Sequence, residues 1–381
     1  MTSPPTYHQE TALKRLLARL IDQERAQVLV SPYQASAGFW FGGASLASDE
    51  AGTIWLSGRY RNYGDSRVGL AEGERGLECA IFRADDGAGI GDANAGGSFS
   101  KVCSWSKADL STAERKVLSI EGTALHQRAD GDWELFISSE KELAYPPGFE
   151  AYQKSGTGVW TIDRLSGPSP DRLSLDSLEP VLETIDRPDY LHVKDPVIFD
   201  MPNGDTAMIF CSHPHIWSSS NTGLAVRRAG QRSFRLQSWE IVSRGPAWDV
   251  AAARITARLP LPKVGPFADR PDCAIYFYDG AECLRSHEQN RQARSRPRGY
   301  SCEELGGAFF GWDDDFPCLS RLSRLEPLFV SPWGTGCSRY VDCLITEAGI
   351  LAVWQQSQPD QSQPLVGHFL SMEEVAQILE D

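Results

Sequence analysis

Acidic residues stand at the start of several short β-hairpin patterns, and they are the first candidates for chemistry in this sequence. The clearest case is Lys194-Asp195-Pro196, directly before the apolar run Val197-Ile198-Phe199. Glu121 and Asp249 precede other apolar runs in a similar way. A buried carboxylate is costly unless it has a partner or a function. Clustered carboxyl groups push their pKa values apart, so a ring of such acids would provide a general acid and a general base.

Residues of other types complete the candidate site. Glu304 follows a loop with five arginines between residues 285 and 298, and we interpret Glu304 as a further candidate acid. The loop is either a lid that binds an anionic group of the ligand or a solvated surface segment. Arg254 is expected on the opposite strand face from Asp249. The candidates for substrate binding are guanidinium, imidazole and aromatic side chains: Arg59, Arg61, His213, His215, Trp248, Arg339 and Tyr340.

The two histidines lie two positions apart, which raises the question of a metal site. Pro214 separates His213 from His215, and no third ligand is close in the sequence. Nine scattered cysteines without a CxxC pair add no zinc motif. We therefore predict no metal site and expect these histidines to form hydrogen bonds with a ligand at the rim, with ordinary loop histidines as the alternative.

A strand–turn–strand pattern recurs five times and predicts the fold. The spacing of its copies exceeds the roughly 40–50 residues that a four-stranded propeller blade needs. We predict an all-β fold, a five-bladed β-propeller, with unrelated hairpins in a β-sandwich as the alternative. The five copies span residues 42–61, 120–139, 194–212, 248–280 and 338–357.

In a propeller, the innermost strand of each blade starts at the mouth of one central funnel. The residues expected there are Ala44-Ser45, Glu121, Asp195, Asp249 and Ser338-Arg339. The predicted fold therefore gathers three acids and an arginine, which are far apart in the sequence, around one site.

The two ends of the chain show helical rather than strand patterns. Leu13, Leu16, Leu17 and Leu20 recur at helical spacing, and Ser371 is a candidate cap for a short helix at the other end. We expect residues 1–30 to form an N-terminal helical segment, residues 31–370 the propeller, and residues 371–381 a C-terminal helix.

The composition limits the classes of partner. The 381 residues carry a formal net charge of −14, which disfavours nucleic-acid binding. The sequence has no apolar run of about 18 residues, so no membrane association is expected. An odd number of cysteines without an export signal predicts a cytoplasmic protein with reduced thiols. The oligomeric state is not indicated.

The hairpins and their turns resemble those of the five-bladed propeller glycoside hydrolases, which include families 43, 32 and 130. Asp195-Pro196 followed by a strand is similar to the Asp-Pro strand start of these enzymes, and residues 77–87 are similar to their strand ending in an Asp-Gly turn. The resemblance covers roughly residues 38–357. It implies a glycosidase-like hydrolase, or a phosphorylase, of carbohydrate metabolism that acts on a small-molecule or oligosaccharide substrate, with no certain cofactor and with Ca²⁺ or water in the central channel.

The sequence also departs from the pattern of family 43. That resemblance implies an Asp base in the first blade, an Asp that tunes pKa in the third, and a Glu acid in the fourth. Asp195 fills the third position, and the shorter acid Asp249 fills the fourth. The first position falls within residues 43–46, Gly-Ala-Ser-Leu, which contain no acid. Glu121 is an extra acid, similar in placement to one in family 130.

Three functions therefore remain open. The first is glycosidic cleavage by a pair of carboxyl groups, with Asp195 as acid or base and Glu121 or Asp249 as its partner. The second is a propeller enzyme of different chemistry on a small polar or anionic molecule, which the missing first-blade acid and the arginine-rich loop favour. The third is a non-catalytic ligand-binding propeller, which would hold its acids in salt bridges.

Overall fold

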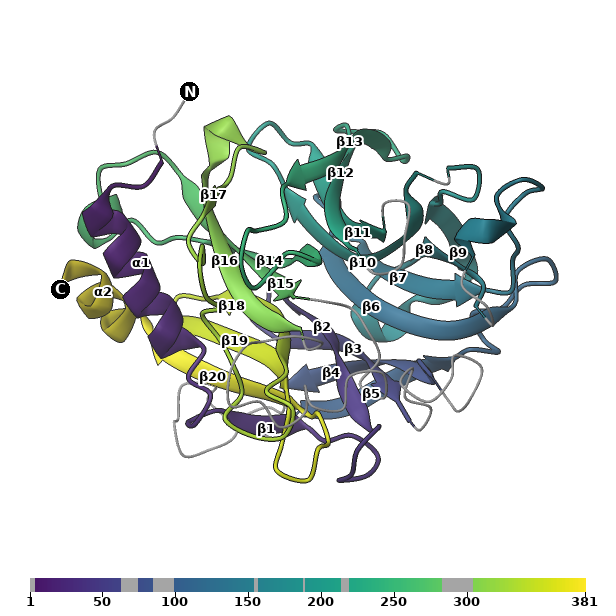
Figure 1. Ribbon diagram of the computed structural model, residues 1–381, viewed down its shortest axis with the longest axis horizontal. Coiled ribbons are helices and arrows are strands. Elements are labelled where there is room, and N and C mark those ends of the chain that lie inside the picture. Colours follow the sequence, from purple (N-terminus) through teal and green to yellow (C-terminus); the bar gives the residue numbers. More distant parts are fainter. Residues whose placement is uncertain are drawn as a thin grey trace.

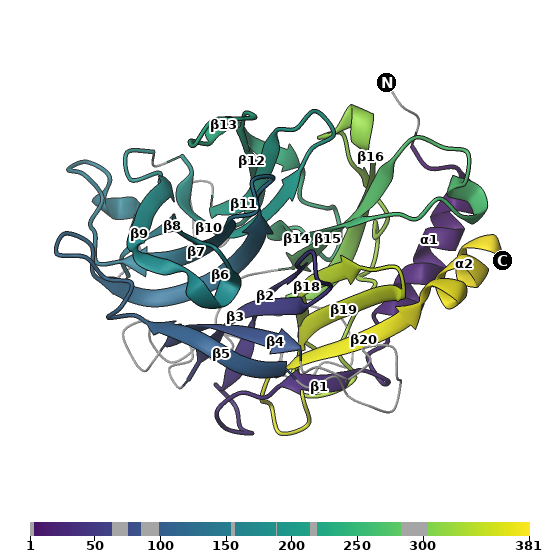
Figure 2. The ribbon, with the colours of Figure 1, turned by 180° about the vertical axis from the view of Figure 1, so that it is seen from behind.

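Five four-stranded antiparallel sheets surround a central axis (Figure 1 and Figure 2). The computed structural model describes residues 4–62, 75–84, 99–153, 157–187, 189–213, 219–282 and 304–381. The arrangement confirms the predicted five-bladed β-propeller and excludes the sandwich alternative. All five predicted hairpins form the inner strands of successive blades.

The chain builds the blades in sequence order. Blade one contains β2 (Trp40–Ser48), β3 (Ile54–Arg61), β4 (Glu78–Ala84) and β5 (Phe99–Ser106). Blade two contains β6 (Val117–Gln127), β7 (Trp133–Lys141), β8 (Val159–Gly167) and β9 (Ser174–Leu182). Blade three contains β10 (Leu191–Asp200), β11 (Thr206–His213), β12 (Asn221–Arg227) and β13 (Arg235–Val242). Blade four contains β14 (Ala252–Pro260), β15 (Cys273–Ala281), β16 (Leu305–Trp312) and β17 (Ser320–Arg321).

Blade five closes the ring with strands from both ends of the chain. It contains β18 (Ser338–Ile345), β19 (Gly349–Gln356), β20 (Leu365–Ser371) and, at its outer edge, β1 (Gln27–Val30). β1 pairs antiparallel with β20. The residues expected in the N-terminal helical segment, 1–30, therefore also supply a strand to the propeller.

Two helices lie side by side against the closing blade (Figure 1). Helix α1 (Tyr7–Leu20) starts with a capping box between Thr6 and Gln9, and α2 (Met372–Glu380) starts with one between Ser371 and Glu374. The predicted leucines of α1 are buried in one core with residues of blades four and five. Neither of these helices, the two that the structure describes, is long and apolar enough to cross a membrane.

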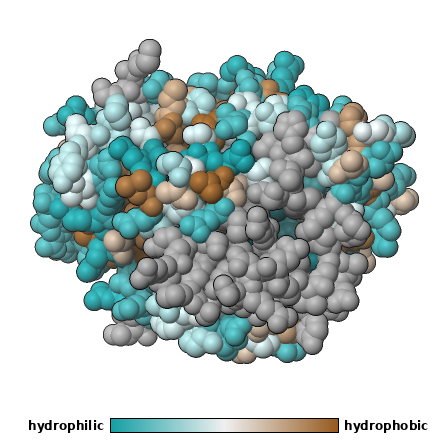
Figure 3. Space-filling model, in the orientation of Figure 1, coloured by the Kyte–Doolittle hydropathy of each residue, from teal (hydrophilic) through white to brown (hydrophobic). Residues whose placement is uncertain are grey.

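Apolar cores lie between neighbouring blades. Trp55 of blade one and Leu135 of blade two share one core, and Phe136 of blade two and Phe210 of blade three share another. Further cores join blades three and four, and blades five and one. The described part of the face in Figure 3 is mostly hydrophilic, with apolar residues in small separate groups. The aromatic residues of the strands thus mainly hold the blades together.

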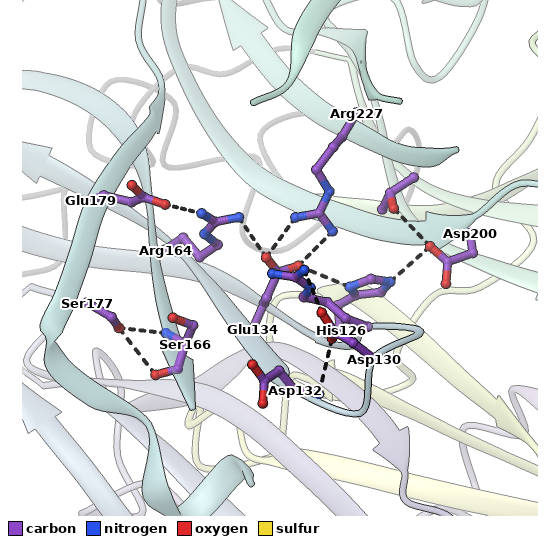
Figure 4. A network of polar contacts seen from close by, with 12 residues as sticks. His126, Asp130, Asp132, Glu134, Arg164, Ser166, Ser177, Glu179, Asp200 and Arg227 are labelled. Carbon is purple, nitrogen blue, oxygen red and sulfur yellow. Dashed lines mark hydrogen bonds and ion pairs between the residues drawn. The ribbon is translucent and has the colours of Figure 1, made fainter. Parts of the chain in front are cut away.

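A buried ionic network also joins blades two and three (Figure 4). At its centre, the fully buried Glu134 accepts hydrogen bonds from Arg164 at 2.6 Å and from Arg227 at 2.7 Å. His126 lies between Glu134 and Asp200, with its ring nitrogens 3.2 Å and 3.1 Å from their oxygens. Burial raises the pKa of Glu134, but His126 and the two arginines outweigh it and hold the pKa at about 2.

The innermost strands share one irregularity that positions the candidate site. In every inner hairpin the register shifts near the start of the inner strand: after Gly42, Ile120, Lys194, Ile255 and Arg339. Such bulges re-aim side chains and are common next to active sites. Beyond the bulges, the five strands line a central cavity of about 110 Å³.

Candidate functional site

The bulges carry the residues from which the site is built. The first residue after each shift is Gly43, Glu121, Asp195, Thr256 or Tyr340. Three of them, Gly43, Asp195 and Tyr340, have positive φ angles of 62°, 52° and 52°. For residues other than glycine this conformation costs on the order of 1–3 kcal/mol, and it persists mainly at functional sites. The predicted equivalence of Glu121 and Asp195 in neighbouring blades is confirmed.

Asp195 is held by neutral hydrogen-bond donors. Its Oδ1 accepts the Gly122 backbone N–H at 3.1 Å, and its Oδ2 accepts the Tyr340 hydroxyl at 3.5 Å. Its own N–H donates to Ser138 Oγ at 3.2 Å. The side chain is buried, and the ion pairs found among the described residues include none to Asp195. Asp195 is thus a fixed carboxylate without a cationic partner in the described part of the chain.

Glu121 forms an ion pair with an arginine. Its Oε2 lies 3.2 Å from Arg59 Nη2, and Ser119 Oγ donates to its Oε1 at 2.9 Å. Burial raises the pKa of Glu121, but Arg59, together with Lys194 and further arginines, outweighs it and lowers the pKa to about 2. Glu121 is therefore ionised at neutral pH.

Glu304 lies between two arginines. Its carboxylate forms ion pairs with Arg254 of β14 and Arg339 of β18. Burial alone would raise the pKa of Glu304, but the two guanidinium groups hold it far below its usual range. Arg254 thus joins the centre of the molecule, whereas sequence reasoning placed it only relative to Asp249, on the opposite strand face.

Tyr340 contacts two carboxyl groups, those of Asp195 and Asp279. Its hydroxyl reaches Asp195, its backbone N–H donates to Asp279 Oδ1 at 3.0 Å, and its ring lies 5.6 Å from the Arg59 guanidinium. Burial raises the pKa of Asp279 to about 7, although the nearby Arg254 lowers it. Burial also raises the pKa of Tyr340, so its hydroxyl remains a proton donor to Asp195.

The guanidinium groups of Arg61 and Arg339 both lie near the ring of Trp40 in blade one. Arg61 and Arg339 lie 4.5 Å and 4.7 Å from the Trp40 ring, within the range of cation–π contacts. Burial lowers the pKa of Arg61 to about 9, and the charges of other arginines contribute. We call the whole group the central cluster. It consists of Trp40, Arg59, Arg61, Arg75, Glu121, Glu140, Lys194, Asp195, Arg254, Asp279, Glu304, Arg339 and Tyr340.

Asp249 and Trp248 lie elsewhere. Asp249 precedes β14, where its Oδ2 accepts the Tyr278 hydroxyl at 2.7 Å and pairs with Arg321 of the outermost strand. The Nε1 of Trp248 donates to the Ser323 carbonyl oxygen at 3.0 Å, and its ring is fully buried against Tyr278. Both residues thus lie in the packing of blade four, outside the central cluster.

His213 is the one of the two predicted histidines that lies in the described part of the chain. It is buried, with its Nδ1 2.7 Å from the Ser219 carbonyl oxygen. Burial lowers the pKa of His213 well below its usual value, and the nearby Lys194 charge contributes. His215 and the arginine-rich loop lie outside the described residues.

The central cavity offers little for a cation among the residues that the structure describes. Its lining includes one carboxyl group, Asp342, whose oxygens accept the backbone N–H groups of Leu46 at 2.6 Å and Cys343 at 2.9 Å. Burial raises the pKa of Asp342 to about 7. No group of three His, Cys, Asp or Glu residues suited to a metal occurs in the described ranges. Ca²⁺ or water in this channel stays a prediction.

Sequence reasoning missed three members of the central cluster: Asp279, Arg75 and Glu140. Asp279, in the segment Tyr278-Asp279-Gly280, was visible only as an acid inside a predicted strand. Arg75 pairs with the buried Glu140 at 2.7 Å. None of the three stands at the start of an inner strand, so the hairpin pattern contained no signal for them.

Comparisons with known proteins identify the fold. No family model matches the chain, and no curated protein matches it in sequence. Solved structures do match. The GH43_1 enzyme of Xanthomonas citri complexed with xylotriose gives a TM-score of 0.53 at 10% identity, covering 95% of this chain and 94% of that one. A GH43 endo-arabinanase from Bacillus licheniformis gives a TM-score of 0.51 at 11% identity, covering 89% and 97% of the two chains. An exo-1,5-α-L-arabinanase from a bovine ruminal metagenomic library gives 0.51 at 10% identity, covering 89% and 95% of the two chains.

These likenesses confirm the architectural resemblance noted in the sequence. The chain has the five-bladed propeller fold found in family 43 glycoside hydrolases, over nearly its whole length. At about one identical residue in ten, the likeness concerns the fold alone. The function must be argued from the central cluster.

Proposed function

We propose that the central cluster is the active site of a carbohydrate-active enzyme that cleaves a glycosidic bond, with Asp195 as the reacting carboxylate. The observation that carries this proposal is the state of Asp195. It occupies a strained bulge at the centre of the propeller, and its carboxylate is held by Gly122 N–H and Tyr340 O–H without an ion pair among the described residues. A carboxyl group held in one position can act as a base or a nucleophile on a bound substrate.

The other acids are suited to different tasks. Glycosidic cleavage needs an ionised carboxylate to activate water or attack carbon, and a proton donor for the leaving oxygen. Glu121 and Glu304 remain ionised beside their arginines, so they suit stabilisation of positive charge rather than proton donation. We therefore assign Asp195 the role of base or nucleophile. Substrates whose leaving group needs little protonation should react most readily.

Nitrophenyl glycosides have such a leaving group and provide the test. Turnover by the wild-type protein and by Asp195→Asn should be compared on a panel of these glycosides, with and without phosphate. We expect Asp195→Asn to lower turnover by about 10²–10⁴-fold. Asp200→Asn, on the same strand but outside the central cluster, is the matched control and should keep activity within a few-fold. Dependence on phosphate would identify a phosphorylase, and unchanged turnover in Asp195→Asn would refute the assignment.

One observation favours a second candidate, a non-catalytic ligand-binding propeller. Glu121 and Glu304 are both held in ion pairs, as expected if acids at the funnel only bind or stabilise. Under this candidate, the wild-type protein would bind a ligand at the central cluster but cleave no glycoside on the panel.

A further inference from the structure

The central cluster has more basic than acidic charge, although the chain as a whole carries −14. The basic members are Arg59, Arg61, Arg75, Lys194, Arg254 and Arg339, and the acidic members are Glu121, Glu140, Asp195, Asp279 and Glu304. A buried surplus of positive charge is unfavourable unless an anion joins it.

Arg59 has hydrogen-bond donors to spare. Its Nη2 pairs with Glu121, but its Nε and Nη1 have no hydrogen-bond partner among the described residues. The residue is 1% exposed. A buried donor left unpaired costs about 1–3 kcal/mol, and more when it is charged. An oxyanion beside Arg59 Nε would give this donor a charge-assisted hydrogen bond.

Gly43 lies beside the unpaired Arg59 Nε. It occupies the bulge position of blade one, where blades two and three carry Glu121 and Asp195. A Cβ atom at Gly43 would lie 3.7 Å from Arg59 Nε and 3.0 Å from the Cα atom of Gly122, so a larger side chain here requires a small shift of the Gly122 backbone. The side chain facing these donors in blade one is therefore a hydrogen atom rather than a carboxylate.

We propose that the central cluster recognises an oxyanion, which Arg59 binds next to Gly43 and which Arg61 and Arg339 around Trp40 attract by their charge. The oxyanion is either the carboxylate of a sugar acid or a phosphate that takes part as co-substrate. That the ligand is a sugar rests on the proposed function, whereas the binding of the oxyanion does not require cleavage. The side chains of Glu304 and Arg339 are 14% and 11% exposed, so the central cluster reaches the surface of the described residues at this point.

Calorimetric titration tests this proposal. The probes are glucuronate and galacturonate, the neutral sugars glucose and galactose, and inorganic phosphate, all at one ionic strength. A charge-assisted hydrogen bond contributes enough for about a tenfold preference, so we expect an anion to bind the wild-type protein about tenfold more tightly than the neutral sugars. Preference for the sugar acids would identify the sugar as the source of the oxyanion, and binding of phosphate would identify phosphate. Both results support the site.

Two variants at one position separate charge from size. Asp195 shows that an aspartate adopts the positive φ of this bulge position, so Gly43→Asp supplies a competing carboxylate beside Arg59. Gly43→Asn has nearly the same size and shape without the charge. We expect anion affinity to fall about tenfold or more in Gly43→Asp and in Arg59→Gln, and to fall much less in Gly43→Asn.

The proposal is overturned if no anion binds at millimolar concentration, if neutral sugars bind as tightly as their acids and phosphate does not bind, or if the two Gly43 variants lose affinity equally. These outcomes differ from failure of the proposed function. Asp195→Asn is expected to retain anion binding, because Asp195 is itself an acid. Full activity of Asp195→Asn would therefore reject its catalytic role and leave the oxyanion site standing.

Discussion

Two buried ionic groups in this propeller differ in whether their charges are matched. The network around Glu134 joins blades two and three, and its three carboxylates, Glu134, Glu179 and Asp200, face Arg164, Arg227 and His126 (Figure 4). The Nη atoms of Arg164 and Arg227 and both ring nitrogens of His126 have hydrogen-bond partners. The central cluster has surplus basic charge and the unpartnered Arg59 donors described above.

The difference separates a structural role from a binding role. A network that satisfies its own charges gains nothing from a ligand, and removing one member leaves the others buried without partners. A cluster with spare donors and strained backbone is poised for a group that is not part of the chain. Burial and ion pairing alone, which the two groups share, would not have distinguished them.

The largest expected loss of stability comes from removing the central carboxylate of the Glu134 network. Glu134→Gln leaves Arg164 and Arg227 without their shared carboxylate, and we expect it to lower the free energy of unfolding by about 3–5 kcal/mol. Urea denaturation measures this loss. Glu179→Gln, which removes a half-exposed partner of Arg164, is the control and should cost no more than about 1 kcal/mol. Similar losses in both variants would contradict a structural role centred on Glu134.

Glu304→Gln sharpens the contrast between the two groups. It leaves Arg254 and Arg339 without their carboxylate, and we expect a loss of about 2–4 kcal/mol in the absence of ligand. Added phosphate or glucuronate should raise the melting temperature of Glu304→Gln more than that of the wild-type protein, because the freed guanidinium groups bind the anion. Glu134→Gln should show no such rescue, and equal rescue of both variants would remove the distinction.

Low pH should reduce the contribution of Glu121 to the stability of the folded protein. Its pKa is lowered from 4.5 to about 2 in the folded protein, so its contribution to stability is complete above pH 4.5 and is lost as the pH falls from 4.5 toward 2. A contribution of about 3 kcal/mol is expected for a shift of this size. The stability difference between wild type and Glu121→Gln should therefore shrink over that range. A constant difference would show that Arg59 does not favour the ionised form.

The smallest expected effect has the opposite sign and belongs to the Glu134 network. Burial would lower the pKa of His126, but its hydrogen bonds to Asp200 and Glu134 raise it above 6.5. The contribution of His126 is therefore fully present below pH 6.5 and is lost as the pH rises through its folded pKa. Wild type should exceed His126→Gln by about 1 kcal/mol at pH 6, and by less at pH 9. Thermal denaturation at the two pH values measures this, and a larger difference at pH 9 would contradict it.

The architecture followed from local patterns, but the membership of the central cluster followed only in part. Strand–turn–strand repeats specify each inner hairpin locally, so the sequence predicted five blades and the equivalent positions of Glu121 and Asp195. Asp249 was placed with them because it precedes an apolar segment. In the fold, however, β14 begins at Ala252, and the position after its register shift is occupied by Thr256.

The remaining members depend on contacts between blades. Asp279 of blade four accepts the backbone N–H of Tyr340 of blade five, and Glu304 joins Arg254 of blade four to Arg339 of blade five. No spacing along the chain encodes these contacts. The surplus charge could not be read from a composition of −14 either, because it exists only within one buried group.

The central claim, that Asp195 is the reacting carboxylate of the central cluster, is tested most directly by chemical rescue. Asp195→Gly removes the carboxylate and suits the positive φ of this position. Turnover of the nitrophenyl glycoside that the wild-type protein cleaves best should be measured for this variant with and without sodium formate. The account predicts a loss of about 10²–10⁴-fold, partly restored by formate acting in place of the missing carboxylate. Turnover at the wild-type rate without formate would contradict it.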